Sequence, residues 1–198
     1  MITVTPNRVV ARAQSITTPR VLVNTLLGMQ VETRRARTAD VRAIRRLLDL
    51  YTAGRFLLDK PTVTLYEDVQ EFWVAERTDV EPPEVVGCGA LHVLWEDLAE
   101  VRTVAVDPAL RGHGIGHQIM AAVLETARRL GIRRLFVLTF ETKFFGSLGF
   151  EEIAGAPVPH DIYDELLRSY DEGVAEFLDL ERVKPNTLGN SRMLLHLD

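Results

Sequence analysis

Residues 100–130 read Glu-Val-Arg-Thr-Val-Ala-Val-Asp-Pro-Ala-Leu-Arg-Gly-His-Gly-Ile-Gly-His-Gln-Ile-Met-Ala-Ala-Val-Leu-Glu-Thr-Ala-Arg-Arg-Leu, and this stretch decides the fold. Its first seven residues are β-branched and apolar enough for a buried strand, which Asp107-Pro108 ends. After Gly116, apolar side chains recur at helical spacing, with arginines in the last turn and Gly131 directly after it. A strand, a glycine loop and a helix in this order form a cradle, because backbone N–H groups and the helix dipole converge on an anion.

The spacing of the glycines narrows the kind of cradle. Gly112, Gly114 and Gly116 do not give the Gly-x-Gly-x-x-Gly of a dinucleotide-binding fold, and His117 stands where a P-loop needs lysine. Arg111-x-x-Gly-x-Gly after a strand instead resembles the acetyl-coenzyme A pyrophosphate loop of the GCN5-related N-acetyltransferases. For the loop taken alone, a plain glycine-rich turn is the alternative interpretation.

A second stretch resembles the same family. Residues 136–150, Phe-Val-Leu-Thr-Phe-Glu-Thr-Lys-Phe-Phe-Gly-Ser-Leu-Gly-Phe, are similar to its second coenzyme A motif, which ends in Gly149-Phe150. The aromatic residues before that pair suit the core, or packing against the pantetheine arm, better than stacking on bases. The resemblance implies that the strand end and the loop bind acetyl-coenzyme A through Val104, Ala105, Val106, Arg111, Gly112, His113, Gly114, Ile115, Gly116 and His117.

The order of helices and strands predicts an α/β sandwich. We expect a mixed, twisted sheet flanked by helices, which is the fold that the resemblance to the GCN5-related N-acetyltransferases implies. Thr38 precedes and Gly54 ends the first helical pattern, and Thr64-x-x-Glu67 has the spacing of a capping box that opens the second helix. Further helices are expected at 117–130, 142–148 and 161–177, and strands at 72–76, 85–94, 100–106, 135–139, from 150 and at 192–197.

Composition limits the class of protein. With 198 residues, 46% of them apolar and 26% charged, the chain has the composition of one ordinary globular domain. No apolar run approaches the roughly 20 residues of a membrane span, so we expect no membrane partner. The single cysteine, Cys88, cannot form an internal disulfide and suits a reducing cytoplasm. It lies in an apolar stretch without an adjoining cation, which indicates a buried, inert thiol.

Charge is unevenly spread along the chain. Residues 1–37 hold six arginines and one glutamate, a net charge of +5, so the remainder carries −10 of the total of −5. Such an acidic remainder argues against nucleic acid as a partner. Residues 1–30 lack acids and any convincing apolar period, and we expect a disordered leader there and the N-acetyltransferase domain at 31–198. An organellar targeting peptide, or a natural start at Met29, is the alternative.

The end of the chain narrows the family. Residues 184–193, Lys-Pro-Asn-Thr-Leu-Gly-Asn-Ser-Arg-Met, together with 57–70, resemble the short, single-domain bacterial N-acetylglutamate synthases. The resemblance runs from about Arg34 to Leu197. It implies a cytoplasmic enzyme that moves acetyl from acetyl-coenzyme A to the α-amine of L-glutamate by direct transfer, the first committed step toward arginine.

Acetyl transfer to an amine needs a base, because only the neutral amine attacks a thioester. Period-two alternation puts Glu100, Arg102 and Val104 on one face of their strand. Glu100 matches the family's general-base position, and we expect it to act directly or through a water. The alternative is a structural ion pair between Glu100 and Arg102. A backbone N–H near Val104 is the expected donor to the oxyanion.

The leaving thiolate needs a proton. Many members of the superfamily use a tyrosine at the position of Phe145, which has no O–H. The resemblance to the synthases points instead to Thr142, whose hydroxyl would equally suit a helix N-cap.

The acceptor has two carboxylates, so its pocket needs more than one anion-binding group. Lys60 and Arg192 match substrate positions of the family, and Arg102 is expected to face the same side as the base. Asn190 and Ser191 add hydrogen-bonding groups. For each cation, and for Lys60 above all, the alternative is a solvated surface charge.

Metal binding is not expected, although His113 and His117 form His-x-x-x-His, because glycines separate them and no third ligand is evident. The expected partners are therefore two small molecules, acetyl-coenzyme A and L-glutamate. The acidic segment 161–181 is interpreted as a solvated face, with a contact in a homodimer as the alternative. Two other functions stay open: acetylation of another amine or amino acid such as glutamine, and a non-catalytic acyl-coenzyme A sensor.

Overall fold

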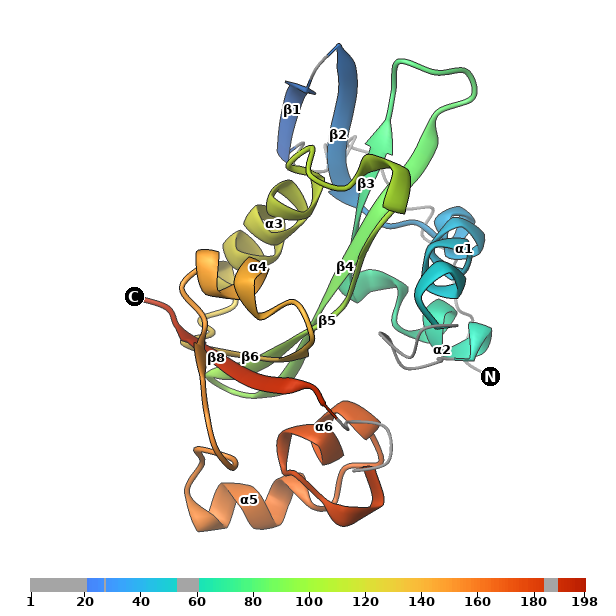
Figure 1. The fold of residues 1–198 in the computed structure, drawn as a ribbon. Coiled ribbons are helices and arrows are strands. Elements are labelled where there is room, and N and C mark those ends of the chain that lie inside the picture. The colour runs from blue at the N-terminus through green and yellow to red at the C-terminus, as the bar shows by residue number, and fades with distance from the viewer. Residues whose placement is uncertain (1–20, 27, 53–60, 184–188) are drawn as a thin grey trace, which may run out of the picture.

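A single eight-stranded sheet forms the centre of the computed structural model, which describes residues 21–26, 28–52, 61–183 and 189–198 (Figure 1). The strand order is β1-β2-β3-β4-β5-β6-β8-β7, and every neighbouring pair is antiparallel except β5 and β6. This mixed sheet confirms the predicted fold class. The strands are β1 (Val21–Leu26), β2 (Met29–Arg35), β3 (Phe72–Arg77), β4 (Glu84–Trp95), β5 (Leu98–Val106), β6 (Arg134–Thr139), β7 (Glu151–Glu152) and β8 (Ser191–His196).

Helices cover both faces of the sheet (Figure 1). The long helix α3 packs on one face, where Ile119, Met120 and Val123 join a fully buried core. It lies so close to β4 that a Cβ added at Gly89 would stand 2.7 Å from the side chain of Ile119. The other face is covered by two groups of helices, one at each end. The helices are α1 (Val41–Thr52), α2 (Thr62–Glu67), α3 (Ile115–Arg129), α4 (Thr142–Ser147), α5 (His160–Leu166) and α6 (Glu172–Phe177).

The two helix groups on the second face leave a gap between them. The apolar side of α1 packs on the β3 and β4 residues and on Ala105, near the end of β5. Helices α5 and α6 pack on Leu98, at the start of β5, and on Phe136 of β6. Since side chains alternate along a strand, Glu100 and Arg102 project from this same face, between the two groups. The fold thus places two charged side chains where neither helix group covers the sheet with apolar residues.

A β-bulge interrupts the alternation of β5 and corrects one prediction. Arg102 pairs with Ala90 and Ala105 pairs with Cys88, so Thr103 and Val104 both stand opposite one residue of β4. Thr103 takes up the extra residue with a left-handed backbone, φ 61°. Val104 therefore packs on the α3 face, and the prediction that it shares a face with Glu100 and Arg102 is wrong.

The only parallel pair of strands in the described sheet separates early. Residues Leu98–Glu100 of β5 pair with residues Arg134–Phe136 of β6, and the two strands are not paired beyond these residues toward their carboxyl ends. The bulge bends β5, and β6 continues beside β8 instead. The separated ends of the two parallel strands leave room for a ligand, as the carboxyl ends of parallel strands commonly do.

The sheet begins earlier than we expected. Strand β1, Val21–Leu26, lies within the segment predicted to be a disordered leader, and it pairs with β2 in a hairpin whose turn has Gly28 at φ 88°. The described sheet therefore includes residues that precede the predicted domain start at residue 31. The signal was present in the β-branched run Val-Leu-Val-Asn-Thr-Leu before a glycine. Residues 1–20 and Gly54, the predicted end of α1, lie outside the described residues.

Two helix predictions also need correction. Helix α2 begins at Thr62 after Pro61, without a side-chain cap, so the Thr64–Glu67 spacing does not open it. The single segment predicted at 161–177 is two short helices, α5 and α6. Within the described ranges, no helix combines the length and the apolar character that crossing a bilayer requires.

Candidate active site

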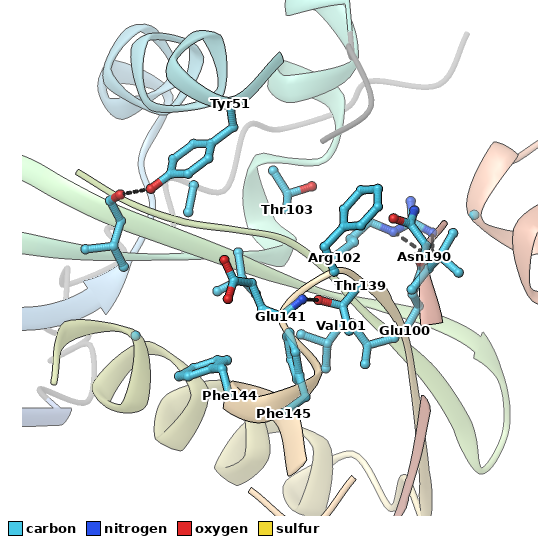
Figure 2. Close-up of a pocket in the computed structure, with 18 of the residues that line it drawn as sticks. Tyr51, Glu100, Val101, Arg102, Thr103, Thr139, Glu141, Phe144, Phe145 and Asn190 are labelled. Atoms are coloured by element: carbon cyan, nitrogen blue, oxygen red, sulfur yellow. Dashed lines mark hydrogen bonds and ion pairs between the residues drawn. The ribbon is translucent and has the colours of Figure 1, made fainter. Parts of the chain in front are cut away.

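A cavity of about 1000 Å³ lies where β5 and β6 separate. One wall is the bulged end of β5 and the loop that leads into α3, and another is the segment from Val137 to Phe145. The N-terminal part of α6, the start of α2, Tyr51 of α1, Arg182 and Asn190 also contribute to the lining. Figure 2 shows Glu100, Arg102 and Asn190 on one side of the cavity, and Tyr51 and Phe144 on the opposite side.

The loop before α3 presents backbone N–H groups to the cavity. Gly112 and Gly114 have left-handed backbones, with φ of 79° and 76°, which glycine adopts without strain. The first bond of the helix runs from the Gln118 N–H to the Gly114 carbonyl, so the three amides between them have no acceptor within the helix. These amides and the dipole of a 15-residue helix make this end of the cavity a site for an anion.

Arg111 adds a positive charge to this loop and ties it to α1. Its Nε donates a hydrogen bond to the Tyr51 hydroxyl at 3.2 Å, and that hydroxyl donates in turn to the Val106 carbonyl. The guanidinium also lies 3.8 Å from the carboxylate of Glu141, which lines the cavity as well. Tyr51 is buried, so the tyrosine joins α1, the end of β5 and the glycine loop at one point.

Nine of the ten predicted cofactor-binding residues line the cavity, and His113 does not. The His113 ring turns back on its own loop, with Nδ1 3.0 Å from the Arg111 carbonyl and 3.2 Å from the Leu110 carbonyl. His117 does line the cavity, where its ring meets Phe144 edge-on at 5.0 Å. The histidine that sequence placed inside the glycine loop therefore shapes the loop rather than the cavity.

Glu100 and Arg102 form a buried ion pair in the cavity wall, and a third residue joins them. Glu100 is 4% exposed, and its Oε2 accepts from Arg102 Nε at 3.0 Å and lies 2.8 Å from Nη2. The other side of the guanidinium donates two hydrogen bonds to Asp171, at 2.9 and 3.1 Å. The ion pair weighed as an alternative thus exists, and Glu100 lines the cavity as well.

The charges of this cluster support one another. Burial alone would lower the pKa of Arg102, but Glu100 and Asp171 outweigh it and raise that pKa. Burial likewise opposes ionisation of Asp171, yet the contact with Arg102 lowers its pKa to about 2. Arg102 and Asp171 are therefore both charged at neutral pH. The two carboxylates engage four of the five N–H groups of Arg102, which leaves one Nη1 hydrogen for a substrate carboxylate, so its predicted substrate role stays a prediction.

The structure places Thr142 outside the cavity lining. Thr142 is the first residue of α4, and the N-cap position belongs to Glu141, so the N-cap alternative is wrong as well. The hydroxyl on this wall is that of Thr139, which is 8% exposed and accepts the Glu141 N–H at 2.9 Å. Phe145, which stands where many members of the superfamily have a tyrosine, also lines the cavity.

Of the predicted substrate-binding residues at the end of the chain, the structure brings only Asn190 to the cavity. The Asn190 Oδ1 is buried and has no hydrogen-bond partner among the described residues. The Ser191 hydroxyl instead donates to Glu152, and the Arg192 guanidinium donates to three backbone carbonyls, including those of Glu176 and Phe177 at the end of α6. Arg192 is thus a structural clamp, and burial lowers its pKa. Lys60 lies outside the described residues.

Segment 170–182 supplies cavity residues that sequence reasoning missed. Asp171, Gly173, Glu176 and Arg182 all line the cavity, so the interpretation of 161–181 as a solvated face is wrong for this part. The available signal was the apolar run Val-Ala-x-Phe-Leu at 174–178, which is buried in the structure. An acidic segment that also carries a buried apolar face has to dock, and here it docks beside Arg102.

Metal binding and nucleophilic attack by a cysteine have little support among the described residues. Among the described residues there is no group of three or more His, Cys, Asp and Glu side chains that could hold a metal ion. Cys88 is fully buried outside the cavity lining, and burial raises the pKa of its thiol to about 12. Its thiolate is therefore not accessible as a nucleophile.

Comparison with known proteins gives the class. Residues 41–150, more than half of the chain, match the acetyltransferase (GNAT) family, and the chain belongs to this family. An amino-acid acetyltransferase of Mycobacterium tuberculosis is 66% identical over 164 residues, which cover 83% of this chain and 93% of that protein. The predicted family and an acetyltransferase activity are confirmed.

Solved structures agree with this class. The crystal structure of Rv2747 from Mycobacterium tuberculosis, in complex with CoA and a second ligand, has a TM-score of 0.80 and 65% identity, covering 84% of this chain and 99% of that one. The N-acetylglutamate synthase of Neisseria gonorrhoeae, complexed with coenzyme A and N-acetyl-glutamate, has a TM-score of 0.66 at 22% identity. The match covers 85% of this chain and 35% of the synthase, and the two proteins share the fold.

Proposed function

We propose that the chain transfers acetyl from acetyl-coenzyme A to the α-amine of an amino acid, with L-glutamate as the acceptor. One observation carries the proposal: the anion-binding end of α3 and the Glu100 carboxylate line the same 1000 Å³ cavity. A donor held by its phosphates at the first site is thereby brought to a base at the second. The 66% identity to an amino-acid acetyltransferase supports an amino acid as acceptor.

The donor side of the cavity suits a phosphorylated thioester. The amides of Ile115, Gly116 and His117, with Arg111 beside them, would bind the pyrophosphate. Glycine at position 116 lets the Phe144 ring pack closely on the loop, because a Cβ there would stand 3.2 Å from the ring. The open edge of β5, from Val104 to Val106, offers backbone groups to the amide-containing pantetheine arm.

The chemistry is a direct transfer. Glu100 takes a proton from the amine nitrogen, directly or through a water, and the nitrogen lone pair attacks the thioester carbon. The carbonyl oxygen gains the negative charge, for which the backbone N–H at Val104 is the proposed donor. The carbonyl then re-forms, the C–S bond breaks, and the excess proton on the nitrogen is taken up by the leaving thiolate, which gives the N-acetyl product and coenzyme A. Because Thr142 lies outside the cavity, we assign the hydroxyl beside the departing sulfur to Thr139.

The acceptor side needs cations for the carboxylates of glutamate. Arg102 is already engaged by two carboxylates, whereas Arg182 lines the cavity and is exposed. Asn190 adds an amide whose oxygen has no partner within the described structure. We therefore assign Arg182 and Asn190 to the acceptor. Lys60, a homodimer and a cytoplasmic location stay predictions.

The test is the rate of coenzyme A release with a panel of acceptors: glutamate, glutamine, aspartate and a polyamine. We expect the highest kcat/KM for glutamate. Arg182→Gln should raise KM for glutamate roughly tenfold or more and leave KM for acetyl-coenzyme A unchanged. Preference for glutamine or a polyamine would replace the acceptor proposal. Thermal stabilisation by coenzyme A without transfer to any amine would instead favour the acyl-coenzyme A sensor.

A further inference from the structure

Asp171 lies where the C-terminal helices meet the ion pair of the cavity. It is the N-cap of α6, and its Oδ1 accepts from the Val174 N–H at 3.0 Å and from Arg102 Nη2 at 2.9 Å. Its Oδ2 accepts from Arg102 Nη1 at 3.1 Å. One carboxylate thus holds both the start of α6 and the guanidinium that contacts Glu100.

Arg102 holds a buried positive charge against Glu100. The guanidinium is 7% exposed, so water screens its charge little, and it lies within 3.0 Å of Glu100 Oε2. A cation this close attracts the negative charge of a carboxylate strongly and competes with a proton for it. A second carboxylate on the same cation offsets that effect, because the positive charge is then shared between two anions.

The first turn of α6 is fitted closely against this cluster. A Cβ added at Gly173 would stand 2.2 Å from Glu100 Oε2 and 2.5 Å from Arg102 Nη2. Only a residue without a side chain lets the turn that carries Asp171 come this near. The position of Asp171 is therefore determined by contacts on both of its sides.

Other charged groups also face the cluster. His92, directly across from Glu100 on β4, has its Nε2 3.9 Å from Asp171 Oδ2 and its Nδ1 2.7 Å from the Glu71 carboxylate. Glu172 and Glu176 of α6 line the same cavity. Glu71, Glu172 and Glu176 are acidic and act in the same direction as Asp171, whereas Arg102 and Arg182, which also lines the cavity, are cations.

We propose that Asp171 is a positioning residue that acts through Arg102: by accepting two of its hydrogen bonds, Asp171 keeps Glu100 basic enough to take the proton of the acceptor amine. The inference rests on the proposed function, in which Glu100 is the general base. The proton moves from the amine nitrogen to a Glu100 oxygen, and Asp171 itself exchanges none. Docking of α6 and the strength of the base are thereby linked.

The experiment compares Asp171→Asn with the wild type in steady-state kinetics from acid to neutral pH. Without the second carboxylate, Arg102 is paired with Glu100 alone, and the acid limb of kcat/KM for the acceptor should move down by about one pH unit. We expect kcat near neutral pH to fall roughly tenfold, because a weaker base accepts the proton less readily. KM for acetyl-coenzyme A should not change, and Asp171→Glu should recover most of kcat.

Asp97→Asn is the matched control. Asp97 accepts two hydrogen bonds from Arg134, at 2.9 and 3.0 Å, in the same bidentate geometry but outside the cavity lining. It should lose stability and leave the acid limb in place. In an Arg102→Gln background, Asp171→Asn should no longer move the limb, which also tests the link if the single variant folds poorly.

An unmoved acid limb with near-wild-type kcat in folded Asp171→Asn overturns the inference and leaves the proposed function intact. A limb that still moves by the same amount in the Arg102→Gln background overturns the route through Arg102. Full activity of Glu100→Gln, by contrast, removes the base from the proposed function itself. The two failures are therefore distinguishable.

Discussion

Glu100 combines two properties that are costly together, a charge and near-complete burial. It is 4% exposed, and the only cation in direct contact with its carboxylate among the described residues is Arg102. Burial of an ionisable pair costs several kcal/mol unless its hydrogen bonds are satisfied, and Asp171 completes them here. A charged cluster of this kind in the wall of a large cavity is typical of a site that moves protons.

Replacing the carboxylate by an amide of the same shape tests its role. Glu100→Gln keeps the packing and removes the proton acceptor, so we expect kcat to fall by roughly 10²–10³-fold with little change in KM for acetyl-coenzyme A. Steady-state rates with each substrate varied in turn measure both constants. Equal loss of affinity for the donor would mean that Glu100 shapes the cavity instead.

Gly173 offers a test by steric contact. Gly173→Ala would place a methyl group 2.2 Å from Glu100 Oε2, so α6 or the ion pair has to shift. We expect kcat to fall at least tenfold, since small displacements of a catalytic group cost that much. Gly146→Ala, at a helical position with open space around it, is the control and should keep wild-type kcat. Wild-type kcat in Gly173→Ala would show that the pair tolerates a shift.

At the scale of elements, the site depends on how α1 and α6 meet the sheet. Arg192 binds the last carbonyls of α6 and lies over the Phe136 ring, with 5.1 Å from its Cζ to the ring centroid. Tyr51 joins α1 to the end of β5 and to Arg111. These two side chains come from elements that contribute nothing to the glycine loop itself, yet they hold its surroundings in place.

Tyr51→Phe tests the connection between α1 and the donor site. The ring stays in its buried position, but the hydrogen bonds to Val106 and Arg111 are lost, so Arg111 is no longer oriented. We expect KM for acetyl-coenzyme A to rise roughly threefold to tenfold, with kcat little changed. Tyr66→Phe, on the exposed side of α2, is the control and should not alter either constant. An unchanged KM would show that Arg111 does not depend on Tyr51 for its orientation.

At the scale of the whole molecule, ion pairs hold the C-terminal half on the sheet. Asp171 is joined to Arg102 across 69 residues of sequence, and Asp97 to Arg134 across 37. Although burial opposes it, the contact with Arg102 lowers the pKa of Asp171 to about 2, and the hydrogen bonds from Arg134 lower the pKa of Asp97. Both carboxylates therefore favour the folded state while they are ionised.

The pH dependence of stability follows from the sign of these shifts. A carboxyl group whose pKa is lower in the folded chain stabilises it above the unfolded pKa of about 3.9, and the contribution is lost as the pH falls toward 2. We expect the free energy of unfolding to fall between pH 4 and pH 2. Asp171→Asn should flatten this fall by about 1 kcal/mol, a value reduced for partial solvent screening. Parallel curves for the wild type and the variant would contradict the assignment.

Much of the cavity was predictable because its donor side is encoded locally. The loop residues follow one another in sequence, and their glycines and the helix after them are visible without any distant contact. The sequence also pointed to Glu100 and Asn190, which line the cavity. Arg192 could not be placed in this way, because whether an arginine meets a ligand or a helix end depends on which element packs beside it.

The sequence by itself determined most of the strands and helices after residue 37, the glycine loop and the family, since each is recognised from residues that lie close together in the chain. Only the tertiary structure decided which side chains face the cavity. The bulge at Thr103 arises where β5 meets β4 and turns Val104 to the other face, and Asp171 reaches Arg102 only once α6 has docked on the sheet. Both depend on contacts between segments far apart in the chain, which no local pattern specifies.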